Sequence, residues 1–394
     1  MLINVIKKWS DKKINGRYFN DEFEIDGIPI WWFLEPFLRQ PYIPKPFKSL
    51  DEIKDNDIGN DKILSYKNNF QFYILRKGLI INEKIKFLIS KFRKKEIDKR
   101  DVLFLVYTNH IVIDNGIKFI HYNEILKNLE KKKIKPLVLI LDPLSKNSLF
   151  NLLQYENLLY DHITYEILKE SKKKAKELNQ KWRRLDEKIK EKLFTFQGKK
   201  YWKLLKNEIN FLFSEEILFI LIKYYLTFKN IIEKYKISVI YINSLIGFYE
   251  IPLLLSTYKL NKKVIYSPHG YGDRYFIIRK EVLKNVLFAA ISNEHKKRLL
   301  KLGIKSKNIV IVGSPLFDKI INYKKRKIKK KGVITLLTQP LIEDKYIEKG
   351  EYFNYVKKLL NQISRINNIK KILLKLHPRE KFRSKLPKVK TLGV

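Results

Sequence analysis

The chain has 394 residues, of which 45% are hydrophobic and 13% aromatic, and it contains no cysteine. This composition excludes an intrinsically disordered chain, and the absence of cysteine excludes disulfides, thiolate nucleophiles and cysteine-ligated metals. The formal net charge is +41, from 82 basic and 41 acidic residues. Such a charge attracts polyanions and anionic membrane surfaces, but a biased genome composition would produce it equally well.

The N-terminal part, residues 1–100, is predicted to form an arm and a helical segment. Its aromatic run at residues 28–38 suits membrane-interface contact, sugar stacking or core packing. Core packing is favoured, because Pro41, Pro44 and Pro46 suggest an extended arm packed on a domain.

Apolar runs and amphipathic stretches then alternate, which is typical of a parallel α/β sheet. A helix is expected at 122–132, and a helical insertion at about 145–236. Ser292 and Gly303 are expected to bound the helix between the last two strands. Together these elements predict a Rossmann-like acceptor-side domain over residues 101–320. The predicted strands are 101–107, 135–141, 237–242, 263–266, 286–291 and 309–312.

The helical insertion contains the most membrane-like segment, residues 211–223, but Glu215, Glu216 and Lys223 interrupt it. It predicts a buried helix with Ser214 as its N-cap. The amino terminus has too short an apolar run for a signal peptide. We therefore expect a cytoplasmic protein, with a peripheral contact to the inner face of an anionic membrane.

A charged run at 324–331 is interpreted as a domain boundary. Beyond it, a strand at 333–337, a helix at about 352–366 and a strand from Lys371 predict a second βαβ unit. Residues 332–394 are thus interpreted as a partial Rossmann-like nucleotide-donor domain, since a full one needs about 100 residues or more. Three alternatives stay open: a fragment, a domain completed by a second chain, or a lost activity.

Polar loops follow three of the predicted strands. Residues 267–273 (Ser-Pro-His-Gly-Tyr-Gly-Asp) and 313–318 (Gly-Ser-Pro-Leu-Phe-Asp) follow two strands of the first domain, and His-Pro-Arg at 377–379 ends the last strand. Open parallel sheets bind ligands in the crevice beyond the carboxyl ends of their strands. A nucleotide is therefore the expected occupant.

The order of these motifs resembles that of glycosyltransferases with two Rossmann domains, the GT-B architecture. The resemblance is strongest to the capsule and surface-polysaccharide group that includes bacterial polysialyltransferases and CDP-glycerol glycerophosphotransferases; UDP-N-acetylglucosamine 2-epimerases share the architecture. It spans roughly residues 239–379 and rests on residues 269–270, 292–295, 312–318 and 375–378. It implies an α/β fold of two Rossmann-like domains, the second incomplete here. The implied activity, in surface-glycan synthesis, is transfer of a sugar or polyol phosphate from a UDP-, CMP- or CDP-linked donor to a hydroxyl of a glycan or lipid-linked acceptor.

The resemblance also implies that His377 contacts the phosphate or nucleotide of the donor, with Arg379 or Lys375 nearby. A cluster of cations and donors stabilises the negative charge on a departing diphosphate. The alternative is that His377 caps the strand by bonding to the backbone. Thr338 and Gln339 follow the first strand of the second domain, where such enzymes hold donor phosphates with hydroxyl and backbone N–H groups.

On the acceptor side, His269 is the candidate base, because an imidazole titrates near neutral pH and can remove a proton from a hydroxyl. Asp273 would orient the ring, and Gly270 and Gly272 allow close backbone approach. The alternative is a turn residue whose ring bonds a carbonyl.

Two weaker sets of candidates belong to the same cleft. Gly313, Ser314 and Pro315 are expected at the hinge between the domains, where a structural role is favoured over ligand contact. His110 and Asp114 follow the first strong strand and are candidates for the acceptor side. No cluster of carboxylates or histidines has metal-ligand spacing, so no metal and no other cofactor is expected.

Two other functions stay open. A UDP-sugar 2-epimerase shares the fold but would require additional acidic residues in the cleft. A non-catalytic polyanion-binding protein would bind RNA or DNA with a steep salt dependence. We do not expect nucleic acid as the partner, because no basic segment carries an RNA-recognition motif, a zinc-finger spacing or a helix-turn-helix pattern.

Overall fold

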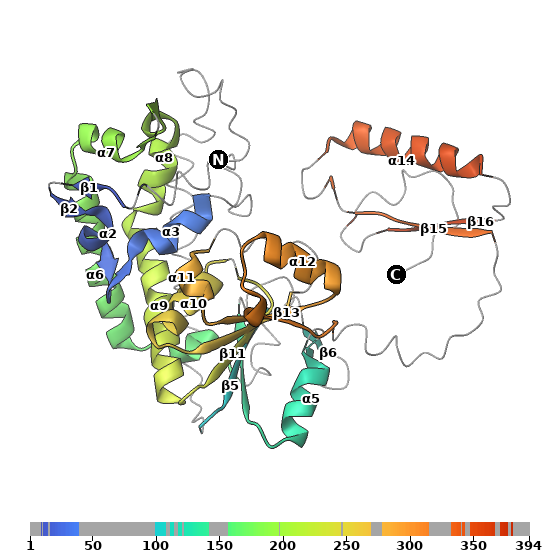
Figure 1. The fold of residues 1–394 in the computed structure, drawn as a ribbon, viewed down its shortest axis with the longest axis horizontal. Coiled ribbons are helices and arrows are strands. Elements are labelled where there is room, and N and C mark those ends of the chain that lie inside the picture. Colours follow the sequence, from blue (N-terminus) through green and yellow to red (C-terminus); the bar gives the residue numbers. More distant parts are fainter. Residues whose placement is uncertain are drawn as a thin grey trace. The chain divides into compact units, whose positions relative to one another are not determined.

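A computed structural model describes most of the chain. The chain divides into two compact units, residues Met1–Asp318 and Lys319–Val394 (Figure 1). The described residues are 9, 11–14, 16–38, 99–107, 111–113, 117–119, 122–141, 157–196, 198–245, 247–268, 278–314, 332–339, 341–342, 347–366, 371–376 and 380.

A six-stranded parallel sheet forms the centre of the first unit, and every adjacent pair of its strands is parallel. Each of these strands was predicted from an apolar run, and the α/β class is confirmed. In spatial order the strands are β14 (Ile309–Ile311), β13 (Val286–Ala290), β12 (Lys263–Tyr266), β11 (Val239–Ile242), β5 (Val102–Tyr107) and β8 (Pro136–Leu141).

The direction of this order reverses between β5 and β11. The chain passes from β5 outward to the edge strand β8, returns to β11 on the other side of β5, and continues outward through β12, β13 and β14. In the register of the two central strands, Tyr241 of β11 lies opposite Phe104 of β5. At such a topological switch point the connections leave in opposite directions, which opens a crevice at the carboxyl ends of the two strands.

Helices cover both faces of the sheet, which explains why its strands are nearly continuous apolar runs. On one face, α9 (Glu215–Lys234) and α10 (Glu250–Lys259) share a core with Leu103 of β5. On the other face, α5 (Asn123–Lys131) packs against Phe104. Figure 1 shows α5 apart from α9 and α10, as two covering layers require.

The predicted helical insertion is confirmed. Ser214 precedes α9 as expected, but its hydroxyl donates to the Phe211 carbonyl at 2.6 Å and does not accept a helix N–H. Within the described ranges, no helix has both the length and the apolar character needed to cross a bilayer. The elements of the insertion that precede α9 are η5 (Leu159–His162), α6 (Tyr165–Arg184), α7 (Glu187–Leu193), β9 (Thr195–Phe196), β10 (Lys199–Lys200) and α8 (Trp202–Leu212).

The described N-terminal residues pack on this insertion. Trp31 and Phe33 are 1% and 0% exposed, so the predicted core packing is confirmed. The extended arm is wrong for residues 30–38, which form a helix containing Pro36. Burial of the apolar side chains outweighs the low helix propensity of proline. The N-terminal elements are β1 (Lys13–Ile14), β2 (Arg17–Tyr18), α2 (Phe19–Glu22), β3 (Glu24–Ile25), β4 (Ile28–Pro29) and α3 (Ile30–Leu38).

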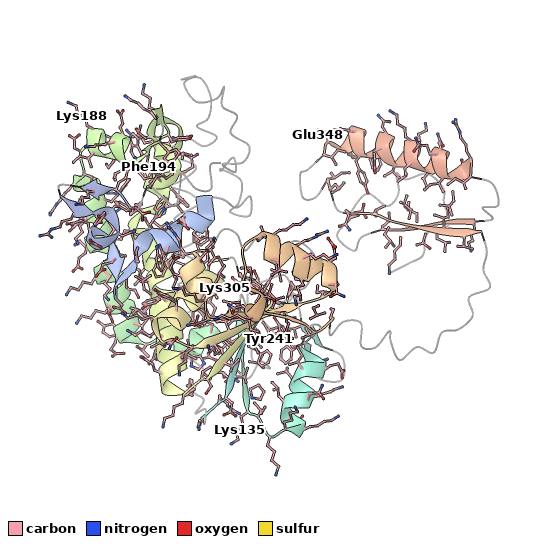
Figure 2. The ribbon with its side chains drawn as sticks, in the orientation of Figure 1. Lys135, Lys188, Phe194, Tyr241, Lys305 and Glu348 are labelled. Carbon is pink, nitrogen blue, oxygen red and sulfur yellow. The ribbon has the colours of Figure 1, made fainter. Side chains whose placement is uncertain are left out.

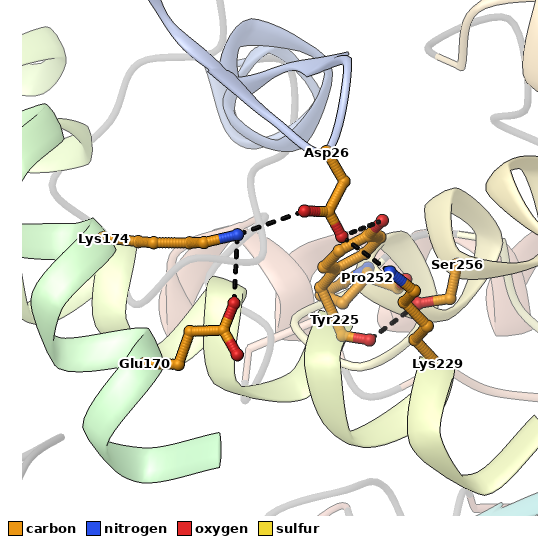
Figure 3. A network of polar contacts seen from close by, with 7 residues as sticks. All are labelled: Asp26, Glu170, Lys174, Tyr225, Lys229, Pro252 and Ser256. Atoms are coloured by element: carbon orange, nitrogen blue, oxygen red, sulfur yellow. Dashed lines mark hydrogen bonds and ion pairs between the residues drawn. The ribbon is translucent and has the colours of Figure 1, made fainter. Parts of the chain in front are cut away.

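One carboxylate joins the turn between β3 and β4 to two helices of the insertion. Asp26 lies 3.1 Å from the Lys174 ammonium of α6 and 2.9 Å from the Lys229 ammonium of α9, and the Tyr225 hydroxyl donates to it at 3.3 Å (Figure 3). Burial alone would raise the pKa of Asp26, but the hydrogen bonds from Lys229 and Lys174 outweigh it, so this pKa is lowered.

The remaining elements of the first unit confirm the predicted helix boundaries. The Ser292 hydroxyl accepts the His295 N–H at 3.2 Å at the start of α12, and Gly303 has φ +83° just beyond its end. These elements are β6 (Ile111–Ile113), β7 (Ile117–Phe119), α11 (Lys280–Leu283), α12 (Asn293–Lys301) and η7 (Ser306–Asn308).

The second unit contains the predicted βαβ arrangement. Strands β15 (Val333–Leu337) and β16 (Lys371–Lys375) are parallel, and α14 (Lys349–Ser364) connects them in the sequence. A small core of Tyr352 and its apolar neighbours on α14 packs toward the strands.

Candidate functional site

Two polar side chains meet at the switch point of the first sheet. Tyr107 is the last residue of β5, and Glu250 begins α10, just after β11. The Tyr107 hydroxyl donates to Oε1 of Glu250 at 2.6 Å. Glu250 is 2% exposed, and its Oε2 has no hydrogen-bond partner among the described residues. A polar pair therefore occupies the place where open α/β sheets bind ligands.

Gly247 makes room for this carboxylate. A Cβ added at Gly247 would lie 2.2 Å from Oε2 of Glu250 and 3.5 Å from the Tyr107 hydroxyl. Only a residue without a side chain lets the loop after β11 pass so close to the carboxylate.

Burial raises the pKa of Glu250 to about 7, although hydrogen bonds from Tyr107 and from the backbone N–H groups of Glu250 and Tyr249 act in the opposite direction. Desolvation disfavours the charged form of a carboxyl. A group that titrates near pH 7 can both accept and donate a proton under physiological conditions. The pair has the chemical character of a general acid or base.

A cluster of phenol groups adjoins the pair through Tyr249. The Tyr160 hydroxyl lies 2.7 Å from that of Tyr249 and 3.1 Å from that of Tyr224. The rings of Tyr107 and Tyr249 meet edge to face, with centroids 6.1 Å apart. This packing fixes the Tyr107 ring, so its hydroxyl is held toward Glu250.

The second unit also holds a buried carboxylate beyond its strands. Glu380 is 8% exposed. It lies five residues after Lys375, the last residue of β16. The Tyr352 hydroxyl donates to its Oε1 at 2.5 Å, and the Thr338 hydroxyl donates to its Oε2. Glu380 thus ties the chain after β16 to the end of β15 and to α14.

This contact bears on the predicted role of Thr338. Its hydroxyl has a single hydrogen, which is directed to Glu380 or, at 3.4 Å, to the Lys375 carbonyl. Its backbone N–H also donates to the Lys375 carbonyl at 3.1 Å. Thr338 and Lys375, two of the predicted donor-site residues, therefore lie side by side, and Gln339 follows them.

The other predicted residues divide into two groups. Gly313, with φ +78°, and Ser314 follow β14 in the first unit, and nothing lies within 4 Å of a Cβ built at Gly313. The backbone conformation and not crowding therefore favours glycine there. Predicted residues outside the described ranges are His110, Asp114, His269, Gly270, Gly272, Asp273, Pro315, His377, Arg379 and the run 324–331.

The structure still locates the start of the predicted 267–273 loop. The Ser267 N–H donates to the Ile242 carbonyl at the end of β11 at 2.9 Å. The loop that carries His269 thus begins beside the strand that precedes Glu250.

Sequence reasoning missed Tyr107, Gly247, Glu250 and Glu380. The first and third are 143 residues apart and belong to no motif. The local signal was limited to their place in the sequence, because Gly247 and Glu250 lie in the segment between the apolar strand β11 and helix α10.

No protein-family model matches the chain, and no curated protein matches it in sequence. Comparison with solved structures finds a likeness to UDP-GlcNAc 2-epimerases. For the Methanocaldococcus jannaschii protein, identity is 17% over 71% of this chain and 66% of that one, with a TM-score of 0.37. For the Neisseria meningitidis protein bound to UDP-GlcNAc, identity is 12% over 75% of this chain and 72% of that one, with a TM-score of 0.39. For the Rickettsia bellii protein, the corresponding values are 11%, 75%, 68% and 0.36.

The chain thus spans slightly less than two thirds of the first of these proteins. The identities and TM-scores are too low to carry a conclusion about function.

Proposed function

We propose that the chain is a glycosyltransferase-like enzyme that moves a sugar or polyol phosphate from a nucleotide-activated donor to a hydroxyl acceptor in surface-glycan synthesis. The observation that carries the proposal is the Tyr107–Glu250 pair at the switch point, with the pKa of Glu250 near 7. Transfer to a hydroxyl needs a base that works near neutral pH. The order of the strand-end motifs supports the nucleotide donor.

In the proposed reaction, the acceptor oxygen attacks the anomeric carbon or the transferred phosphorus, and the bond to the leaving nucleotide breaks. The leaving group departs with the bonding electron pair. Because Glu250 is buried and Tyr107 is only partly buried, Tyr107 is the group that meets the acceptor. The acceptor proton passes to the Tyr107 oxygen, and the phenol proton passes to the ionised Glu250.

The remaining roles follow the predicted motifs. His377, with Arg379 and Lys375, would stabilise the negative charge of the leaving nucleotide. His269, oriented by Asp273, is the alternative base. We further propose a cytoplasmic enzyme that contacts an anionic membrane peripherally and acts on a glycan or lipid-linked acceptor.

Epimerisation of a UDP-sugar is the second candidate. It requires acidic residues in the cleft, and Glu250 is a buried acid at the carboxyl end of the sheet. The products separate the two reactions, because transfer joins the sugar to an acceptor, whereas epimerisation yields an isomeric nucleotide sugar and needs no acceptor.

The test starts with thermal stabilisation of the full chain by UDP, CMP, CDP and their sugar or glycerol conjugates, repeated with His377→Ala. One nucleotide class should stabilise the wild type and not the variant. The conjugate of that class is then incubated with and without hydroxyl acceptors, and the products are separated by mass and by chromatography. RNA binding that falls steeply with salt, without any nucleotide binding, would refute both enzyme proposals.

The base is tested with Glu250→Gln and a matched control, Glu208→Gln on α8. Burial raises the pKa of Glu208 to about 7 as well, but Glu208 belongs to the helical insertion. Glu250→Gln should lower the turnover number by roughly 10² to 10⁴-fold, and Glu208→Gln should not. Equal activity of Glu250→Gln and wild type would leave His269 as the base.

A further inference from the structure

A groove lies between α5 and the edge strand β8, with a cavity volume of about 790 Å³. Six of its thirteen lining residues are apolar, four are basic and one is acidic. The lining residues are Arg100, Phe119, Asn123, Leu126, Lys127, Glu130, Lys133, Ile134, Lys135, Pro136, Val138, Ile140 and Asn157.

The floor of the groove is an apolar stripe. Pro136, Val138 and Ile140 alternate along β8, so their side chains lie on one face of the sheet, and Leu126 faces them from α5. Pro136, Val138 and Leu126 are only partly buried. The stripe therefore keeps apolar surface in contact with water that a hydrocarbon chain would cover.

Three of the four basic lining residues lie near the amino ends of the strands. Arg100 precedes β5, and Lys133 and Lys135 lie where the chain passes from α5 into β8, as Figure 2 shows for Lys135. Nε of Arg100 is buried and has no hydrogen-bond partner among the described residues. Buried guanidinium donors normally have partners, so a ligand acceptor in the groove would complete the hydrogen bonding of a nitrogen that no described residue satisfies.

The groove is separate from the switch-point site. Arg100, Lys133 and Lys135 lie at the amino end of the sheet, whereas Tyr107 and Glu250 lie at the carboxyl end. Glu130 is the one acidic lining residue of the groove. Arg100, Lys133 and Lys135 at this end of the groove favour a ligand with more than one negative charge, and the planar donor fork of arginine matches phosphate.

We propose that the groove binds a phosphate monoester carried by a single alkyl chain, with the phosphate at Arg100, Lys133 and Lys135 and the chain along the apolar stripe. The occupant is an anionic amphiphile, either a free alkyl phosphate or the same headgroup presented by a bilayer. This inference does not depend on the proposed transferase activity.

The test measures binding of dodecyl phosphate to the full chain by calorimetry, below its micelle concentration. Inorganic phosphate and dodecanol should each bind at least about tenfold more weakly, because each lacks one of the two contacts. Arg100→Gln should weaken the binding of dodecyl phosphate about tenfold or more. Lys297→Gln, which removes one exposed charge on α12, should leave the affinity for dodecyl phosphate unchanged.

Equal weakening by Arg100→Gln and Lys297→Gln would overturn the proposal, since net charge alone would then explain the affinity. A second readout does not rely on variants: an alkyl phosphate with a photoreactive group at its chain end should label residues between 119 and 140. Labelling only elsewhere would also refute the site.

Vesicles containing phosphatidic acid, whose headgroup is a phosphate monoester, separate the two sources of the headgroup. If the groove takes the ligand from a bilayer, Arg100→Gln should reduce vesicle binding about as much as it reduces dodecyl phosphate binding. If only free alkyl phosphate enters, vesicle binding should be equal for Arg100→Gln and Lys297→Gln.

Discussion

The two units each bury a glutamate just beyond their parallel strands, and the surroundings of the two carboxyl groups differ. Glu380 receives hydroxyl donors on both oxygens, from Tyr352 and Thr338. Glu250 receives the Tyr107 hydroxyl on Oε1, while Oε2 has no hydrogen-bond partner among the described residues.

The difference separates a positioning role from a chemical one. A carboxylate bonded on both oxygens holds its neighbours in place, as Glu380 holds the chain after β16 against Thr338. A buried carboxyl with one oxygen that no described residue hydrogen-bonds, and with a pKa of about 7, exchanges a proton near neutral pH. We therefore expect changes at Glu250 to alter pH dependence, and changes around Glu380 to alter local order.

The largest effect is expected from Glu250→Gln. Between the ordinary carboxyl pKa of 4.5 and the folded value of about 7, the unfolded chain ionises while the folded chain keeps its proton. The free energy of unfolding of the wild type thus falls as pH rises through this window, by up to about 3 kcal/mol from this group. Glu250→Gln should remove that fall, measured by denaturant unfolding at pH 4.5 and pH 7.5.

Glu208→Gln serves as the control for this window, because burial raises the pKa of Glu208 in the same direction. Both variants should flatten the dependence on pH, and the double variant should flatten it further. If Glu250→Gln retained the full slope of the wild type, the carboxyl would be ionised in the folded chain and the contrast with Glu380 would collapse.

Gly247→Ala should give the next largest effect. The new Cβ would lie 2.2 Å from Oε2 of Glu250, so the carboxylate must move, and overpacking of this kind lowers the free energy of unfolding by about 1–3 kcal/mol. Gly350→Ala is the control, because nothing lies within 4 Å of its added Cβ. Wild-type stability and activity in Gly247→Ala would show that the carboxylate position is not constrained.

Tyr352→Phe tests the other side of the comparison. It removes the buried hydroxyl that donates to Glu380. We expect the free energy of local unfolding of the second unit to fall by about 1–2 kcal/mol. The measurement is hydrogen exchange of the α14 amides, since this reports on the second unit by itself. Tyr355→Phe on the same helix, where the side chain is 57% exposed, should leave the exchange rates unchanged; equal effects would contradict the positioning role of Glu380.

The sequence predicted the sheet more fully than the site, for a physical reason. Buried parallel strands are continuous apolar runs, so β5 and β8 could be found locally, and the Ser292 cap and Gly303 stop also depend on neighbours in sequence. The Tyr107–Glu250 pair depends on strand order, which local patterns do not give. The helix at residues 30–38 was missed because the nearby prolines suggested an extended arm, whereas tertiary burial of Trp31 and Phe33 decided the conformation.

A third carboxylate extends the comparison to charged partners. Lys174 and Lys229 lower the pKa of Asp26, so its stabilising contribution is present above the ordinary pKa of 3.8 and is lost as pH falls through the lowered folded value. Because Asp26 is partly exposed, solvent screens its ion pairs. Asp26→Asn should therefore lower the free energy of unfolding at pH 7 by only a few tenths to about 1 kcal/mol. The deficit should vanish in acid, the reverse of the trend for Glu250→Gln. A deficit that stayed constant from pH 7 to pH 2 would mean that Asp26 acts through the shape of its turn, and the two lysines would then add nothing that depends on its charge.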